Sequence, residues 1–196
     1  GELARYQWRI EWVWLLAAMG VLMLQALLLA SLWWYALRLM GAVVSWRLAV
    51  SLWLKTQIAR YLPGGLWDVA GRVTLGQQVG ISVRASSASV VLEMTLQILS
   101  ASLFLALLPV LRGDVAARSY FPLAAGLIAL CLVTAAPPVF RRLVNMLLRL
   151  LRKPPLGIEM TYRDVLIMLA MRLLGHLMVG ASFVLFARGV SDISWQ

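Results

Sequence analysis

Glu93 is an acidic residue inside a long apolar stretch, and two polar residues follow it at helical spacing. Gln97 and Ser100 stand four and seven positions after Glu93, so on a helix the three side chains share one face. An acid or a base at the centre of a membrane-spanning helix costs roughly 2.5–3.5 kcal/mol on insertion scales, and such residues face the interior of a helix bundle. We therefore expect the Glu93 carboxylate to meet a polar partner inside the protein.

Arg172 and His176 form a second pair at a spacing of four residues, in another apolar stretch that also contains Gly175 and Gly180. Small residues let neighbouring helices approach closely. A guanidinium at this depth attracts a carboxylate, such as that of Glu93, or a phosphate oxygen. His176 is interpreted as a core residue, because no Cys, Asp or Glu stands at metal-ligand spacing with it. We predict neither a metal nor a cofactor.

A third group of candidates lies in RYLPGGLWDVAGR, residues 60–72. Pro63 lacks a backbone donor and the two glycines after it favour non-helical dihedral angles, so a helix is expected to break here. The freed backbone amides and the start of the next helix create a positive potential, which Arg60 and Arg72 reinforce. Asp68 is predicted to cap that helix. We predict a phosphate site at this turn, and the predicted polar groove consists of Arg60, Pro63, Gly64, Gly65, Arg72, Glu93, Gln97 and Arg172.

The composition is that of an integral membrane protein. Hydrophobic residues make up 62% of the 196 positions, charged residues 13%, and the mean hydropathy is +0.86, outside the range of soluble domains. Tryptophans stand at both ends of the first apolar run, as in the aromatic belts at the two membrane interfaces. The single cysteine, Cys131, cannot form an internal disulfide and is interpreted as a packing residue.

Four stretches are long and apolar enough to cross a bilayer, which takes about 20 residues. They are residues 13–34, 88–111, 120–140 and 165–187. Residues 45–79 are too polar for plain spans and predict a re-entrant helical hairpin with the Pro-Gly-Gly turn at its tip. The expected fold is an all-α, polytopic membrane helix bundle, a single domain over residues 1–196. Because the chain opens with Gly-Glu-Leu rather than Met, we expect a fragment whose beginning is missing, and the resemblance described below implies that the other end is missing too.

Residues 140–153 are expected to form a basic interfacial helix. One side carries Leu143, Leu147, Leu150 and Leu151, and the membrane-surface basic residues are Arg141, Arg142, Arg149, Arg152 and Lys153. At an anionic membrane surface each basic residue contributes about 1 kcal/mol. The excess of basic residues places this segment and residues 38–85 on the cytoplasmic side. A net charge of +10 fits phospholipid head groups as partners. Nucleic acid is not expected, because the basic residues are spread along membrane boundaries.

Residues 45–93 carry a resemblance to a known family. The segment SWRLAVSLWLKTQIARYLPGGLWDVAGRVTLGQQVGISVRASSASVVLE resembles the central stretch of the lysylphosphatidylglycerol synthase transmembrane region, also called the flippase-like domain family. The matching residues are Gln57, Arg60, Tyr61, Leu62, Pro63, Gly64, Gly65, Gly71, Arg72, Gly80 and Glu93. Family domains are longer and contain a second Pro-Gly-Gly element, which is absent here.

An internal similarity indicates where that second element would follow. ALRLMGAVVSW (36–46) and VLFARGVSDISW (184–195) share an apolar helix end, a Gly and a Ser-Trp pair. With the predicted topology, the two copies leave their spans on opposite sides of the membrane. They would then be inverted repeats, an architecture common in transporters.

The resemblance implies a multi-pass protein of the bacterial inner membrane that binds and translocates anionic or aminoacylated phospholipids, or a lipid-linked precursor. We predict that it is not an enzyme, since no carboxylate cluster, no nucleophile beside a histidine and no phosphate-loop spacing is present. Two alternatives stay open. One is an enzyme acting on a lipid-linked substrate, and the other is a non-transporting subunit that positions a synthase or glycosyltransferase partner.

Overall fold

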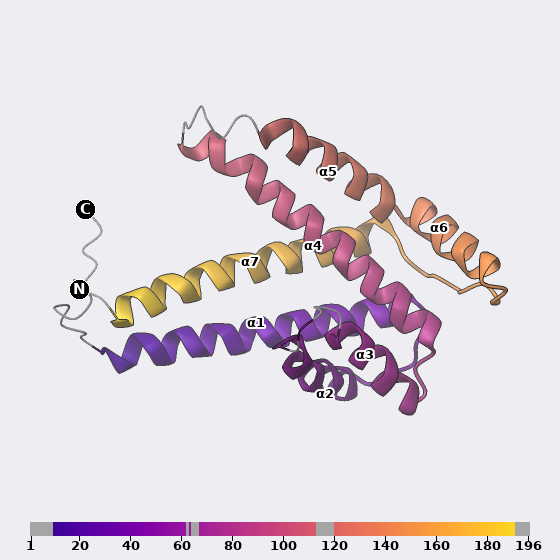
Figure 1. The fold of residues 1–196 in the computed structure, drawn as a ribbon, viewed down its shortest axis with the longest axis horizontal. Helices are drawn as coiled ribbons and strands as arrows, with labels where there is room; N and C mark the ends of the chain where they lie inside the picture. The colour runs from indigo at the N-terminus through magenta and orange to yellow at the C-terminus, as the bar shows by residue number, and fades with distance from the viewer. Residues whose placement is uncertain (1–9, 62, 64–66, 113–119, 191–196) are drawn as a thin grey trace.

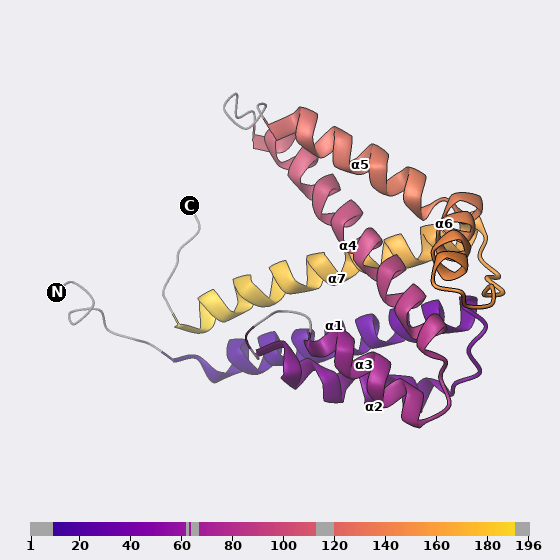
Figure 2. The same cartoon turned by 45° about the vertical axis from the view of Figure 1, so that its right-hand side comes forward.

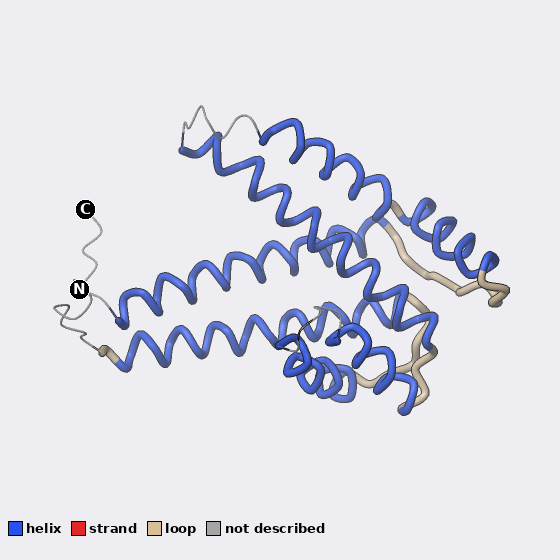
Figure 3. The backbone as a smooth tube through the Cα atoms, viewed as in Figure 1, coloured by secondary structure: helices blue, strands red, loops and turns tan. Residues whose placement is uncertain are grey.

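A computed structural model describes residues 10–61, 63, 67–112 and 120–190, with the side chains of residues 60 and 108–112 left aside. Throughout these ranges the regular structure is helical and contains no strand (Figure 3). The helices are α1 (Trp12–Leu39), α2 (Trp46–Gln57), the short 3-10 helix η2 (Ile58–Tyr61), α3 (Trp67–Gln78), α4 (Val83–Arg112), α5 (Phe121–Ala135), α6 (Pro137–Leu150) and α7 (Tyr162–Val190). The all-α bundle is confirmed.

Helices α1 and α7 lie side by side and antiparallel along their whole length (Figure 1). At one end the backbone N–H of Glu11 donates to the carbonyl of Gly189 at 2.9 Å, and at the other the N–H of Glu159 donates to the carbonyl of Leu39 at 2.9 Å. Glycines allow this close approach: a Cβ at Gly175 would lie 3.3 Å from Leu29. Gly175 therefore serves helix packing, as expected, whereas a Cβ at Gly180 would meet no atom within 4 Å.

Gly189→Leu is expected to lower the free energy of unfolding by about 1–3 kcal/mol, the usual cost of overpacking. A Cβ at this position would lie 2.8 Å from Cδ2 of Leu15 and 3.3 Å from its backbone nitrogen. The melting temperature in detergent measures the effect. The matched control is Gly180→Leu on the same helix, because a Cβ there meets no atom within 4 Å. Equal melting temperatures for the two variants would show that the contact does not matter.

Helix α4 crosses the α1–α7 pair diagonally and carries α5 on its far side (Figure 1). Its buried leucines, Leu92, Leu96 and Leu99, belong to one core cluster with residues of α1, α5 and α7. Cys131 of α5 is a member of this cluster and is 4% exposed, so its interpretation as a packing residue is confirmed. This core holds α4 at the centre of the bundle.

Three helices, α1, α4 over Val83–Leu107 and α7, are long and apolar enough to cross a membrane. Helices α5 and α6 reach that criterion only as a pair, bent by 74°, so the described residues contain three to four candidate spans. The predicted span 120–140 is therefore not one straight helix, because it includes α5, the bend and the first residues of α6. Ala136 has an extended ψ of 128°, because a residue before proline avoids the helical region. Pro137 then starts a new helix, where a missing N–H costs nothing.

Helix α6 corresponds to the predicted interfacial helix but begins and ends three residues earlier, at Pro137 and Leu150. Arg152, with a φ of 54°, and Lys153 follow it in the loop to α7, so neither is helical. Leu143 and Leu147 lie on the side of α6 that faces α4 and α5. Leu150 is 80% exposed and is not among the residues of α6 that line the groove between α4, α5 and α6.

Helix α2 precedes the Pro-Gly-Gly segment and α3 follows it. The two helices pack against each other, and α2 also packs against α1 (Figure 1). A Cβ at Gly71 of α3 would lie 3.1 Å from the side chain of Thr56 on α2. Pro63 is an exposed turn residue whose carbonyl accepts from Nε1 of Trp67 at 2.6 Å. The helix–break–helix arrangement predicted for residues 45–79 is confirmed. Its re-entrant position in the bilayer stays a prediction.

The hairpin starts and finishes at one end of the bundle, where Ile81 shares a core cluster with Ala49 and Val50. The loop after α6 reaches the same end, because Nη1 of Arg84 donates to the carbonyl of Pro154 at 2.7 Å. Figure 2 shows α6, the start of α4 and the start of α7 gathered there. The two basic segments therefore lie on one side, as the predicted topology requires.

Candidate functional site

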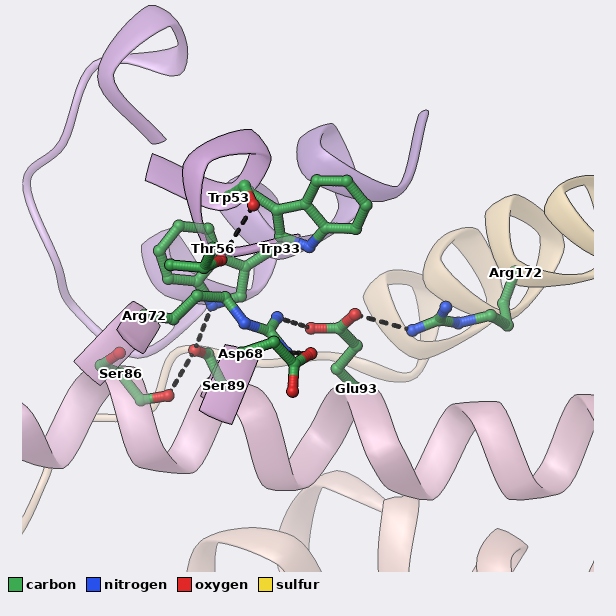
Figure 4. A network of polar contacts seen from close by, with 9 residues as sticks. All are labelled: Trp33, Trp53, Thr56, Asp68, Arg72, Ser86, Ser89, Glu93 and Arg172. Atoms are coloured by element: carbon green, nitrogen blue, oxygen red, sulfur yellow. Dashed lines mark hydrogen bonds and ion pairs between the residues drawn. The ribbon is translucent and has the colours of Figure 1, made fainter. Parts of the chain in front are cut away.

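Glu93 lies between two arginines from different helices (Figure 4). Its Oε2 accepts from Nη1 of Arg72 on α3 at 2.6 Å, and its Oε1 accepts from Nη2 of Arg172 on α7 at 3.0 Å. Arg72 lies 21 positions before Glu93 in the sequence and Arg172 lies 79 positions after it, and the three are brought together by α4 crossing the bundle. The expectation that Glu93 pairs with arginines inside the protein is confirmed.

The three charged residues are removed from the surface. Arg72 is 4% exposed, Glu93 7% and Arg172 5%. Charges at this depth are tolerated only when they are paired and hydrogen-bonded, because desolvation costs several kcal/mol for each ion. One carboxylate shared by two guanidiniums leaves positive charge in excess, and Asp68 offsets it with Oδ2 at 3.6 Å from Nη2 of Arg72.

Trp33 of α1 contacts Arg72 through its indole ring. The Arg72 guanidinium carbon lies 5.7 Å from the centroid of the indole ring, within the range of a cation–π contact. The indole Nε1 donates to Oγ of Ser89 on α4 at 3.1 Å, and Ser89 donates to the carbonyl of Ser86 at 2.8 Å (Figure 4). The position of Arg72 is thus determined jointly by α1, α3 and α4. Its Nε is buried and has no hydrogen-bond partner among the described residues.

A cavity of about 340 Å³ opens beside the ion pairs. Its polar lining residues are Gln25, Asp68, Arg72, Glu93, Gln97, Arg172 and His176, and its apolar ones are Leu29, Met94, Gly175 and Val179. The cavity therefore offers hydrogen-bond donors, acceptors and both signs of charge inside a bundle that is otherwise apolar. Such an arrangement suits a polar molecule that must be shielded from hydrocarbon.

Four of the predicted groove residues lie together in this cavity: Arg72, Glu93, Gln97 and Arg172. Pro63 is described but does not belong to the lining. The side chain of Arg60, together with Gly64 and Gly65, lies outside the described residues. The predicted phosphate site at the hairpin tip therefore stays a prediction.

Three further lining residues, Gln25, Asp68 and His176, were not predicted as part of the groove. Gln25 is a polar residue in the first apolar run, and that isolation is the signal that could have found it. His176 Nε2 lies 2.9 Å from Oγ of Ser100, and its ring meets Phe104 edge-on at 5.6 Å. No group of three or more His, Cys, Asp or Glu side chains in the described ranges is placed to hold a metal ion.

The predicted membrane-surface residues lie away from this cavity. Arg141, Arg142 and Arg149 line a separate hollow of about 650 Å³ on α6, and all three are exposed. Arg152 and Lys153, in the following loop, are exposed as well. The basic side of α6 is therefore free to meet an anionic surface.

Comparison with curated proteins and with solved structures gave no match. A family model described as Lysylphosphatidylglycerol synthase TM region matches residues 1–193. The match extends well beyond residues 45–93, where the motif resemblance lies, and takes in all the helices of the bundle. This multi-pass membrane chain, with its buried Arg72–Glu93–Arg172 network, belongs to the lysylphosphatidylglycerol synthase TM region family.

Proposed function

We propose that the protein binds the polar head group of a phospholipid in the Glu93 cavity and carries it across the bacterial inner membrane. The observation that carries this proposal is the polar cavity itself, bordered by buried charges and located among three membrane-length helices. An anionic or aminoacylated phospholipid, or a lipid-linked precursor, is the proposed substrate class.

The depth of the ion pairs supports translocation. Glu93 stands ten residues after the start of α4 at Val83, and Arg172 ten residues after the start of α7 at Tyr162. At 1.5 Å per residue, both lie about 15 Å from the same end of the bundle. This depth is about half of the hydrocarbon thickness of roughly 30 Å. A polar group crossing the bilayer meets its highest barrier at the midplane, where this cavity would shield it.

The charges also fit such a ligand. Two guanidiniums can donate to a phosphate in paired hydrogen bonds, and the carboxylates of Glu93 and Asp68 can accept from an ammonium group. A head group with both a phosphate and an amine would exchange these internal pairs for its own. The Nε of Arg72, which is buried without a hydrogen-bond partner, is a further donor on one of these guanidiniums.

The experiment measures lipid exchange between leaflets in liposomes that contain the protein and fluorescent phospholipids. Gln97→Leu removes a polar lining group without breaking an ion pair, and we expect the exchange rate to fall about tenfold, equivalent to about 1.4 kcal/mol. Gln78→Leu, at an exposed glutamine of α3 outside the cavity, is the matched control and should leave the rate unchanged.

The two alternatives give different results in the same liposomes. A chemically changed lipid, detected by mass spectrometry, would favour an enzyme acting on a lipid-linked substrate. If the liposomes show no lipid exchange and no chemically changed lipid, the result would favour a non-transporting subunit that positions a synthase or glycosyltransferase. Equal exchange with the two glutamine variants would contradict the role of the cavity.

A further inference from the structure

A second, larger groove is lined by other residues of α4, together with residues of α5 and α6. Its volume is about 770 Å³, more than twice that of the Glu93 cavity, and the two share no lining residue. Val91 and Ile98 of α4, Leu130 of α5, and Leu143 and Leu147 of α6 line it. Most of the lining is apolar, so the groove suits a hydrocarbon chain rather than a head group.

The groove has the length of an acyl chain. Its lining runs along α4 from Val83 to Ile98, which is about 22 Å at 1.5 Å per residue. The hydrocarbon of one leaflet is about 15 Å thick, half of the bilayer core. One tail can therefore lie in the groove from the membrane interface to the midplane.

One end of the groove is cationic. Arg84, at the start of α4, and Lys153, in the loop after α6, both belong to the lining, and no Asp or Glu does among the residues described there. Nη1 of Arg84 donates to the carbonyl of Pro154 at 2.7 Å. Pro154 directly follows Lys153 in the sequence, so this bond holds the guanidinium close to the backbone of Lys153. A guanidinium carries five N–H donors, so Arg84 retains donors for a phosphate.

We propose that this groove binds one anionic phospholipid, with an acyl chain against α4, α5 and α6 and the phosphate between Arg84 and Lys153. Helix α6 supports this choice of occupant, because its two sides differ. The side over the groove carries Phe140, Leu143 and Leu147, while Arg141 and Arg149 line the hollow on its other side. A helix with this division lies at the membrane surface above lipid tails.

The charges favour a lipid over a protein helix. An apolar helix seated in the groove would cover its leucines but leave two cations at its end without a counter-ion. An anionic phospholipid satisfies both parts at once. The site is independent of the proposed function, because it uses other residues of α4.

Native mass spectrometry of the purified protein, mixed with equal amounts of phosphatidylglycerol and phosphatidylcholine, tests the proposal. We expect wild-type protein to retain phosphatidylglycerol preferentially. Lys153→Gln should lower that preference about fivefold, because a basic residue at an anionic surface contributes about 1 kcal/mol. Lys55→Gln removes the same charge from an exposed position on α2, outside the groove lining, and should leave the preference unchanged.

A filling variant tests the tail site separately. Val91 is 52% exposed and lines the groove, so Val91→Trp should reduce retention of both lipids while the melting temperature stays within a few degrees of wild type. Two results would overturn the proposal: equal losses with Lys153→Gln and Lys55→Gln, or unchanged retention with Val91→Trp. Lipid exchange between the leaflets of liposomes is measured with the same variants. A failure of the function proposed for the Glu93 cavity is then distinguished from a failure of the lipid site in the groove.

Discussion

Glu93→Gln is expected to lower the free energy of unfolding by about 3–5 kcal/mol, the cost of removing one partner from a buried ion pair. The amide would leave the guanidiniums of Arg72 and Arg172, both at most 5% exposed, without the carboxylate that now lies 2.6 Å and 3.0 Å from them. Asp68 lies farther away, with Oδ2 at 3.6 Å from Nη2 of Arg72, and compensates only part of this loss. Thermal unfolding in detergent measures the loss.

Two further variants make this result specific. Glu159→Gln removes a carboxylate from an exposed loop position and should change stability by less than about 0.5 kcal/mol. Combining Glu93→Gln with Arg172→Gln removes a charge of each sign, so the double variant should be more stable than the sum of the single effects by 0.5–3 kcal/mol, the usual range for residues in contact. Additive effects would contradict a shared ion pair.

Trp33→Ala is expected to cost about 3–5 kcal/mol, as for other large aromatic residues truncated in a core. Trp33 is 0% exposed and contacts α3 through Arg72 and α4 through Ser89. Its loss would leave a cavity at the junction of three helices and would loosen the Arg72 side chain. The change in melting temperature is the measurement.

Trp12→Ala is the matched control for this prediction. Trp12 belongs to the same helix but is 68% exposed, so its truncation leaves no internal cavity and should have a small effect. If both variants melt at the same temperature, Trp33 does not join the helices as described. A lower lipid-exchange rate with Trp33→Ala alone would further link the position of Arg72 to the proposed function.

The membrane spans were predictable where a long apolar run coincides with one straight helix. Residues 13–34 and 165–187 lie within α1 and α7, and residues 88–111 lie within α4. The third apolar run, residues 120–140, does not form one straight helix, because the backbone leaves the helical conformation at Ala136. Hydropathy alone does not report such a change in backbone geometry. The Pro137–Pro138 pair was the available signal, since it ends one helix and starts another.

For the site, polar residues inside apolar runs indicated which side chains must face inward. Insertion cost alone implies that Glu93 and Arg172 avoid hydrocarbon, and Gln97 follows from helical spacing. The same logic did not identify Asp68 or His176 as part of the groove, because capping and core packing explain those residue types equally well.

The amino-acid sequence was sufficient to establish a helical membrane protein, its break at Pro-Gly-Gly and the residues that cannot face lipid, because these depend on hydropathy, helical period and backbone chemistry. The tertiary structure decided which partners meet: that Glu93 is shared by Arg72 and Arg172, that Trp33 supports Arg72, and that α4 lines a polar cavity and an apolar groove with different residues. These contacts join residues far apart in the chain, and they depend on how helices cross, which local periodicity does not specify.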